Sequence, residues 1–246
     1  MTQIGIWGTS SDDVLIGTEG SDTIFGFGGN DELIAGGGND SLFGDEGNDT
    51  LVGGDGNDTL LGGDGDDFLL DGAGDDIIHG GAGHDWLYLS SGDDWSFGGD
   101  GNDMIIDGEG NDTLNGGAGD DYLFGHNGND ILDSGVGDDG LNGGNGNDTL
   151  TGGDGADIFE FNIGYDETGS TSWGDDVITD FTPGEDQIYI FVMAGDENAL
   201  SITDTANGAL ISYADGASTM LVDNVLAADL TILADFSDPY ADPYYM

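Results

Sequence analysis

The sequence predicts an all-β solenoid with an antiparallel cap at its C-terminal end, on the strength of three observations. Residues 8–160 divide without insertion into seventeen consecutive nonapeptides. Each nonapeptide has a glycine-rich first half, and an apolar residue recurs at position eight. After Glu160 the period breaks and apolar and polar residues alternate instead. A fixed short period indicates a repeat architecture in which each unit buries its apolar side chain against its neighbours.

Each nonapeptide combines a turn with a short strand, as residues 53–61 (GGDGNDTLL) illustrate. We expect glycines at positions one, two and four to adopt positive φ, and Asn or Asp at position five to act as turn formers. Positions seven to nine form a strand whose middle residue points inward. That residue is Leu, Ile or Phe in every copy except the one with Ser96. Two copies then make one flattened coil, so odd copies stack in one sheet and even copies in the other.

Position six is Asp in every copy. Stacking arranges these residues in two columns, in which successive coils, and therefore neighbouring carboxylates, lie about 4.8 Å apart. At that spacing neighbouring carboxylates repel by about 0.9 kcal/mol in water and several-fold more near protein. The columns therefore need bridging cations, and oxygen ligands in loose geometry favour Ca²⁺ over Mg²⁺ or transition metals. The alternative is Asx turns with solvated carboxylates, although Asn or Ser would serve those equally. The predicted ligands are Asp13, Asp22, Asp31, Asp40, Asp49, Asp58, Asp67, Asp76, Asp85, Asp94, Asp103, Asp112, Asp121, Asp130, Asp139, Asp148 and Asp157.

The pattern G-G-x-G-x-D-x-U-x, with U apolar, resembles the hemolysin-type calcium-binding nonapeptide of the RTX (repeats-in-toxin) family of secreted bacterial proteins. The resemblance covers residues 8–160 of 246. It implies a right-handed parallel β-roll in which each Ca²⁺ lies between loops n and n+2, held by Asp side chains and main-chain carbonyls. Seventeen loops allow up to about fifteen such ions. The first loop lacks its inner glycines, so the site at Asp13 fits the pattern least well.

The charge balance limits the possible partners. The chain has 52 Asp and Glu and neither Lys nor Arg, a formal charge of −52 at pH 7. Composition alone favours disorder, but the apolar residues recur at a fixed phase, so we expect a fold that takes cations from solution. Nucleic acid and anionic membrane surfaces are excluded as partners, because both require basic residues. The absence of Cys excludes disulfide and thiol chemistry.

We divide the chain into a lead-in (1–7), the calcium-binding roll (8–160) and a capping region (161–246). In the last region, the nonapeptide-like pieces 174–179 and 184–189 offer Asp176 and Asp186 as further metal ligands, with turns alone as an equal alternative. From Leu200, three alternating stretches predict antiparallel strands, and residues 227–230 predict a short helical turn. We expect no signal peptide and no membrane insertion. The resemblance implies export by type I secretion machinery that reads a C-terminal signal, and hence an extracellular or cell-surface location.

The outward positions seven and nine of the odd copies are unusually apolar. Such a patch usually marks an interface; alternatively the C-terminal segment, or Ile4, Ile6 and Trp7, folds back over it. A smaller cluster on the even copies comprises Ile77, Trp95 and Phe97. The predicted self-association residues are Phe68, Leu70, Trp86, Tyr88, Met104, Ile106, Tyr122 and Phe124.

No enzyme is expected, because the three His have no recurring Ser or Cys partner and the carboxylates belong to the columns. The sequence favours a secreted structural protein that folds on binding many Ca²⁺ ions and assembles as a homo-oligomer or polymer into a filament, surface layer or matrix. One alternative is a monomeric Ca²⁺-dependent folding and secretion module of a larger RTX protein or enzyme. Ice or polysaccharide binding ranks last, since Ile77, Trp95 and Ile131 interrupt the outward threonines.

Overall fold

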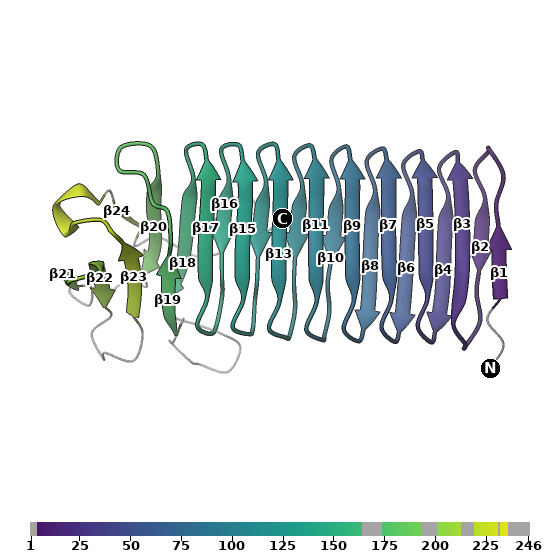
Figure 1. Cartoon of the computed structure of the whole chain (residues 1–246), viewed down its shortest axis with the longest axis horizontal. Helices are drawn as coiled ribbons and strands as arrows, with labels where there is room; N and C mark the ends of the chain where they lie inside the picture. The colour runs from purple at the N-terminus through teal and green to yellow at the C-terminus, as the bar shows by residue number, and fades with distance from the viewer. Residues whose placement is uncertain (1–3, 164–173, 193–200, 213–218, 231, 236–246) are drawn as a thin grey trace.

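In the computed structural model, the described residues are 4–163, 174–192, 201–212, 219–230 and 232–235. They form two long sheets that run side by side along the molecule (Figure 1). Consecutive copies alternate between the sheets, and partner residues lie 18 positions apart, as in Leu69↔Leu87↔Ile105. All pairings between named strands are parallel except those of β21 with β22 and of β22 with β23. The predicted fold, a parallel β-roll with an antiparallel C-terminal cap, is confirmed.

The eleven-stranded sheet holds the odd copies. Its strands, in spatial order, are β2 (Val14–Ile16), β4 (Glu32–Gly37), β6 (Thr50–Asp55), β8 (Phe68–Ala73), β10 (Trp86–Tyr88), β12 (Met104–Ile106), β14 (Tyr122–Phe124), β16 (Gly140–Asn142), β18 (Ile158–Ile163), β20 (Gln187–Val192) and β24 (Ile232–Asp235).

The thirteen-stranded sheet holds the even copies and both additions at the ends of the roll. Its strands, in spatial order, are β1 (Ile4–Trp7), β3 (Asp22–Gly28), β5 (Ser41–Glu46), β7 (Thr59–Asp64), β9 (Ile77–Ala82), β11 (Trp95–Asp100), β13 (Thr113–Ala118), β15 (Ile131–Val136), β17 (Thr149–Asp154), β19 (Asp175–Ile178), β23 (Thr219–Asp223), β22 (Gly208–Ser212) and β21 (Ser201–Asp204).

The core is a single file of position-eight side chains from each sheet, buried from Ile24 to Phe159, with Leu15 partly buried at the end. Position one also points inward, and Ala35 and Leu89 are buried there. Most strands run from position seven of one copy to position three of the next, so they are longer than the predicted three residues. The turn is accordingly confined to positions four to six.

The glycine prediction was right for most glycines at positions two and four, with Gly20, Gly108, Gly110 and Gly128 as exceptions, and wrong for position one. Gly54 and Gly56, at positions two and four, have φ of 115° and 132°. Described position-one glycines have no positive φ; a Cβ on Gly53 would instead lie 2.5 Å from Asp58 Oδ2 and 2.5 Å from the Asp71 carbonyl. Position one is therefore small because it faces the carboxylate and the next coil.

The prediction that Asn and Asp occupy position five because they tolerate a left-handed backbone was also wrong, because none of these residues has positive φ. Its side-chain oxygen accepts a hydrogen bond from the position-five N–H one coil further on. Asn48 N–H donates to Asn30 Oδ1 over 3.1 Å, and Asp66 N–H donates to Asn48 Oδ1 over 3.2 Å. These residues thus form an outer ladder that aligns successive turns.

Both ends of the roll are extended by further strands. β1 pairs with β3 at the first edge of the thirteen-stranded sheet, so Ile4, Ile6 and Trp7 do not fold back over the apolar face of the other sheet. At the other end β19 and β20 continue the two sheets, and β23 to β21 follow β19. The predicted helical turn is the 3₁₀ turn η1 (Ala227–Asp229).

Candidate metal centre

The position-six aspartates form two buried ladders, one for each sheet. The backbone N–H of each donates to Oδ1 of the position-six Asp one coil later, over 2.6–3.1 Å. One ladder starts at Asp22 and continues from Asp148 to Asp176; the other starts at Asp13 and continues from Asp157 to Asp186. Asp176 and Asp186 therefore occupy the next rungs of the two columns.

The second oxygen of most rungs has no hydrogen-bond partner although it is buried. A buried carboxylate oxygen without a donor is costly, and a bound cation would offset that cost. Anionic oxygens beside backbone carbonyls are the donor set that Ca²⁺ accepts. The residues therefore fit calcium. The unpartnered Oδ2 atoms of this kind belong to Asp31, Asp40, Asp49, Asp58, Asp67, Asp76, Asp85, Asp94, Asp103, Asp112, Asp121, Asp130, Asp139, Asp148, Asp157 and Asp176.

Three predicted ligands at the ladder ends differ, because a threonine already occupies their Oδ2. Thr9 donates to Asp13 Oδ2 from its N–H (2.6 Å) and its hydroxyl (2.8 Å). Thr18 donates to Asp22 in the same way, over 2.7 and 2.9 Å. At the far end, Thr182 N–H donates to Asp186 Oδ2 over 2.6 Å. These carboxylates are satisfied by the chain itself, so they fit a cation less well than the other sixteen.

Burial raises the pKa of the inner rungs above the usual range. Desolvation is the main cause, and the carboxylates of adjacent coils add to it, while the ladder hydrogen bond opposes it. The pKa rises to about 7 at Asp58 and Asp121, to about 8 at Asp130 and to about 9 at Asp176. Since the chain has no Lys or Arg, its own side chains cannot neutralise ionised rungs.

The position-six pattern did not predict two further ligand candidates, because they lie at position one. Asp71 and Asp107 replace the usual glycine there, both are buried, and the Oδ2 of each lacks a partner. Each lies with two rungs of the even-copy ladder in a group whose ligand atoms are within 4.8 Å of one another. The substitution of Gly by an acidic residue was the available signal.

The three histidines make contacts that explain them structurally. His84 Nδ1 accepts a hydrogen bond from Asn102 N–H over 2.8 Å, so His84 acts as a rung of the outer ladder in place of Asn. His79 stacks on Phe97 with ring centroids 4.8 Å apart, and His126 stacks on Phe124 at 3.8 Å. Burial lowers the pKa of His79 and His126.

Comparison with known protein families identifies the repeat. The RTX calcium-binding nonapeptide repeat matches residues 7–42, 34–69, 61–96, 70–105, 97–132, 106–141 and 133–167. The chain belongs to the RTX calcium-binding repeat family. Membership implies calcium binding by the repeats, and the donor set of the aspartate ladders agrees with it. It leaves the number of ions open.

Among solved structures, the chain is similar to the solution structure of the AlgE6R3 subunit from the Azotobacter vinelandii mannuronan C5-epimerase, at 24% identity and a TM-score of 0.34. That match covers 59% of this chain and 85% of the subunit. It is also similar to the extracellular lipase LipA from Serratia marcescens, at 19% identity and a TM-score of 0.36, over 79% of this chain and 39% of the lipase. No curated protein matches. Among the described residues, no helix has the length and apolar character needed to cross a bilayer.

Proposed function

We propose that this RTX protein is an extracellular structural protein that folds when its ladders bind Ca²⁺ and then associates with further copies. The observation that carries the calcium part is the set of sixteen buried, unpartnered Oδ2 atoms in two regular columns. We propose that the rungs from Asp31 to Asp176 are the calcium ligands. The threonine-capped Asp13, Asp22 and Asp186 would be weaker ones.

Calcium dependence follows from the charges of the chain. Bound Ca²⁺ would supply the positive charge that 52 acidic side chains lack. At the low free Ca²⁺ of a cytoplasm, the carboxylates repel and keep the chain extended and suitable for type I export. At millimolar external Ca²⁺, mass action stabilises the folded state. Weak single sites suffice because stacked coils couple to their neighbours.

The outer face of the eleven-stranded sheet supports self-association. Position seven of β8, β10, β12 and β14 presents Phe68, Trp86, Met104 and Tyr122 in register. Phe68 is 40% exposed and Trp86 is 47% exposed. The described strands of the capping region extend the edges of the two sheets and do not cover this face. A second copy of the roll, which is equally regular, would fit such a flat apolar surface.

The position-nine residues contribute less exposed area than expected. Leu70, Tyr88, Ile106 and Phe124 are half-buried, since they pack along their own column. The thirteen-stranded sheet has a similar position-nine column, in which Phe25 and Phe43 stack with centroids 4.7 Å apart. The faces therefore differ in the succession of position-seven residues: four large apolar side chains follow one another on the proposed interface, whereas Thr113 separates Trp95 from Ile131 on the other face.

The role we propose is structural and not catalytic. The buried carboxylates that acid–base chemistry would use are engaged in the ladders through Oδ1, and the three histidines make stacking or ladder contacts. No activity is therefore needed to account for these residues.

Sedimentation velocity tests the proposal. In several millimolar Ca²⁺, the wild-type chain should form species larger than a monomer, and Trp86→Ser combined with Tyr122→Ser should lower the oligomeric state without unfolding the roll. The matched control is Trp95→Ser, which removes a 55%-exposed side chain from the other sheet and should change nothing. A compact wild-type monomer in Ca²⁺ would contradict self-association and favour a monomeric folding module.

A further inference from the structure

One column of the roll departs from the repeat over three successive even copies. Position one is Gly in most copies, but here it is Asp71, Leu89 and Asp107 in sequence. All three side chains are buried. Asp94 is the position-six rung of the second of these three copies. Two acidic residues thus enter the interior of the turns at the middle of the even-copy ladder.

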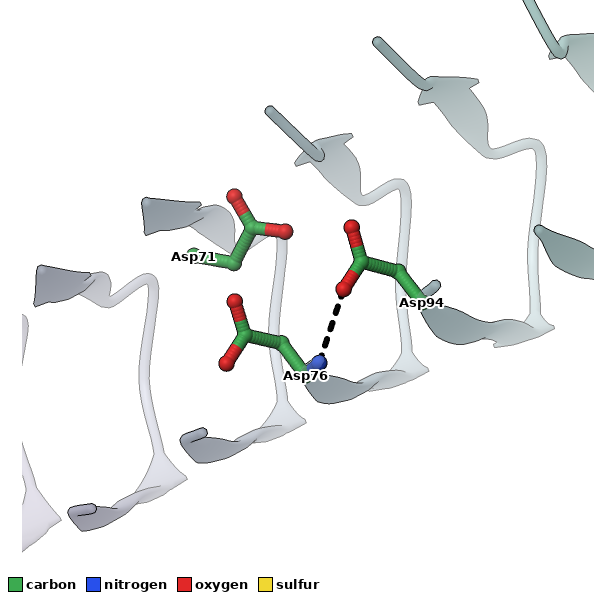
Figure 2. Close-up of side chains that lie close together, drawn as sticks. All are labelled: Asp71, Asp76 and Asp94. Atoms are coloured by element: carbon green, nitrogen blue, oxygen red, sulfur yellow. Dashed lines mark hydrogen bonds between the residues drawn. The ribbon is translucent and has the colours of Figure 1, made fainter. Parts of the chain in front are cut away.

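The inward aspartates lie against ladder rungs. Asp71, Asp76 and Asp94 each offer a carboxylate oxygen, and these oxygens lie within 4.8 Å of one another (Figure 2). Asp94, Asp107 and Asp112 form a second group with the same property. Asp94 belongs to both groups, so five carboxylates gather on three coils.

The position-one carboxylates are held by one oxygen and leave the other without a partner. Asp71 Oδ1 accepts a hydrogen bond from the N–H of Gly72, and Asp107 Oδ1 accepts one from Gly108 N–H over 2.6 Å. Oδ2 of each is buried and has no partner. Figure 2 shows the Asp71 carboxylate reaching toward that of Asp94. Gathering unpartnered anionic oxygens inside a protein is strongly unfavourable unless a cation joins them.

A purely structural explanation for Asp71 and Asp107 is weak. Gly occupies the same position in most copies without loss of the strand register, so the fold does not require a side chain there. Where the column does carry an apolar residue, as at Ala35 and Leu89, it joins the core. An aspartate in that place adds a buried charge and no packing advantage over either.

We propose that Asp71 and Asp107 create two three-carboxylate cation sites, Asp71–Asp76–Asp94 and Asp94–Asp107–Asp112, which take up Ca²⁺ before the rest of the ladder does. Ordinary rungs offer only position-six carboxylates, and the affinity of calcium sites is tuned by the number of charged ligands. Loading these sites first would fix three neighbouring coils in the middle of the roll. Folding would then spread from there toward both ends, as in other repeat arrays.

This inference rests on the proposed calcium-dependent function and adds an order of loading to it. The test is a titration with Ca²⁺ alone, in which bound ions are counted by competition with a chromophoric chelator. For the wild type, we expect a tight class of two ions whose dissociation constants are about tenfold or more below those of the remaining ions. Asp71→Gly with Asp107→Gly restores the residue usual at that position and should abolish the tight class while the weaker class remains.

Two further variants separate charge from packing. Asp71→Asn with Asp107→Asn keeps the side-chain volume and should also lose the tight class. Leu89→Gly, the same replacement between the two aspartates, removes no carboxylate and should keep it. Hydrogen exchange of the wild type at limiting Ca²⁺ should show residues 71–118 protected first.

The outcomes distinguish this inference from the function on which it rests. A wild-type chain that binds no Ca²⁺ would overturn the proposed function itself. Calcium binding without a tight class, or a tight class that survives both double variants, would overturn only the loading order. Loss of the tight class in Leu89→Gly would overturn the assignment to carboxylates.

Discussion

The two oxygens of each ladder aspartate have different roles. Oδ1 of Asp121 accepts the hydrogen bond of Asp103 N–H over 2.7 Å and holds one coil to the next, whereas Oδ2 is buried and unpartnered. The first role needs only an acceptor, which an amide also supplies. The second depends on the negative charge, because the affinity of a calcium site rises with the number of charged ligands.

Asp121→Asn therefore separates the two roles. With Ca²⁺ present, we expect the midpoint of calcium-induced folding to shift to higher concentration, since a charged ligand is lost. In Ca²⁺-free buffer the same variant should retain at least as much β-structure as the wild type, since a buried charge is lost. Far-UV circular dichroism, recorded in chelator and during a Ca²⁺ titration, measures both.

Asp120→Asn is the matched control for Asp121→Asn. Asp120 is the exposed neighbour whose Oδ1 accepts from Asp138 N–H, a bond that Asn preserves. It should leave the calcium midpoint unchanged. Equal shifts in the two variants would mean that general charge reduction, and not ligation by the rung, governs folding.

The sequence predicted the positions of the rungs, because an Asp at every ninth residue is fixed by the repeat alone. It did not predict which oxygen bonds to the backbone, nor that Thr9, Thr18 and Thr182 cap the ladder ends, because these depend on three-dimensional contacts. Asp71 and Asp107 were missed for another reason. They replace the glycine that is usual at position one, so the repeat pattern that identifies position six does not identify them.

At the scale of strands, β11 contains the one irregular core residue of the repeat. Ser96 takes the place of Leu at position eight between Ile78 and Leu114, it is fully buried, and its Oγ has no partner. A buried hydroxyl without a hydrogen bond destabilises the folded state by about 1–3 kcal/mol. The strand keeps its register because its backbone pairs on both sides.

Ser96→Ala should raise the free energy of unfolding of the Ca²⁺-loaded roll by about 1 kcal/mol, because it removes the unpartnered hydroxyl. Urea unfolding at saturating Ca²⁺ measures the change. Ser41→Ala, at an outward position of β5 in the same sheet, should have little effect. A Ser96→Ala chain that is less stable than the wild type would mean that the hydroxyl has a partner in solution.

Strand existence was easier to predict than strand length. The x-U-x half of each copy was expected to hold the whole strand, yet β6 runs from Thr50 through Asp55. Glycines are weak strand formers by propensity, but Gly54 pairs with Gly36 and Gly72 on either side. Pairing with two neighbours overrides local preference here, which a single repeat unit cannot reveal.

At the scale of the whole molecule, the ladders couple folding to protons as well as to calcium. Burial raises the pKa of many rungs, to about 7 at Asp67 and Asp85 and about 8 at Asp130, from an ordinary value of 3.8. At a pH between the ordinary pKa of 3.8 and these raised pKa values, the folded chain binds more protons than the unfolded chain. Stability without calcium therefore falls as the pH rises.

Calcium-free protein should accordingly be more folded at pH 5 than at pH 8. The affinity for Ca²⁺ should show the opposite pH dependence and rise from pH 5 to pH 8, because protons compete for the same carboxylates. Far-UV circular dichroism of calcium-stripped protein at the two pH values measures the first effect. A calcium-free chain that gains structure on moving from pH 5 to pH 8 would contradict the buried ladders.

The most direct test of the central claim, that the aspartate ladders fold the chain only when calcium fills them, is a Ca²⁺ titration of the wild-type chain at neutral pH, followed by far-UV circular dichroism. We predict an unfolded chain in chelator and a steep, cooperative transition to β-structure, because many sites load while coupled coils form. A shallow single-site curve, or a chain that is fully folded in chelator, would contradict the account.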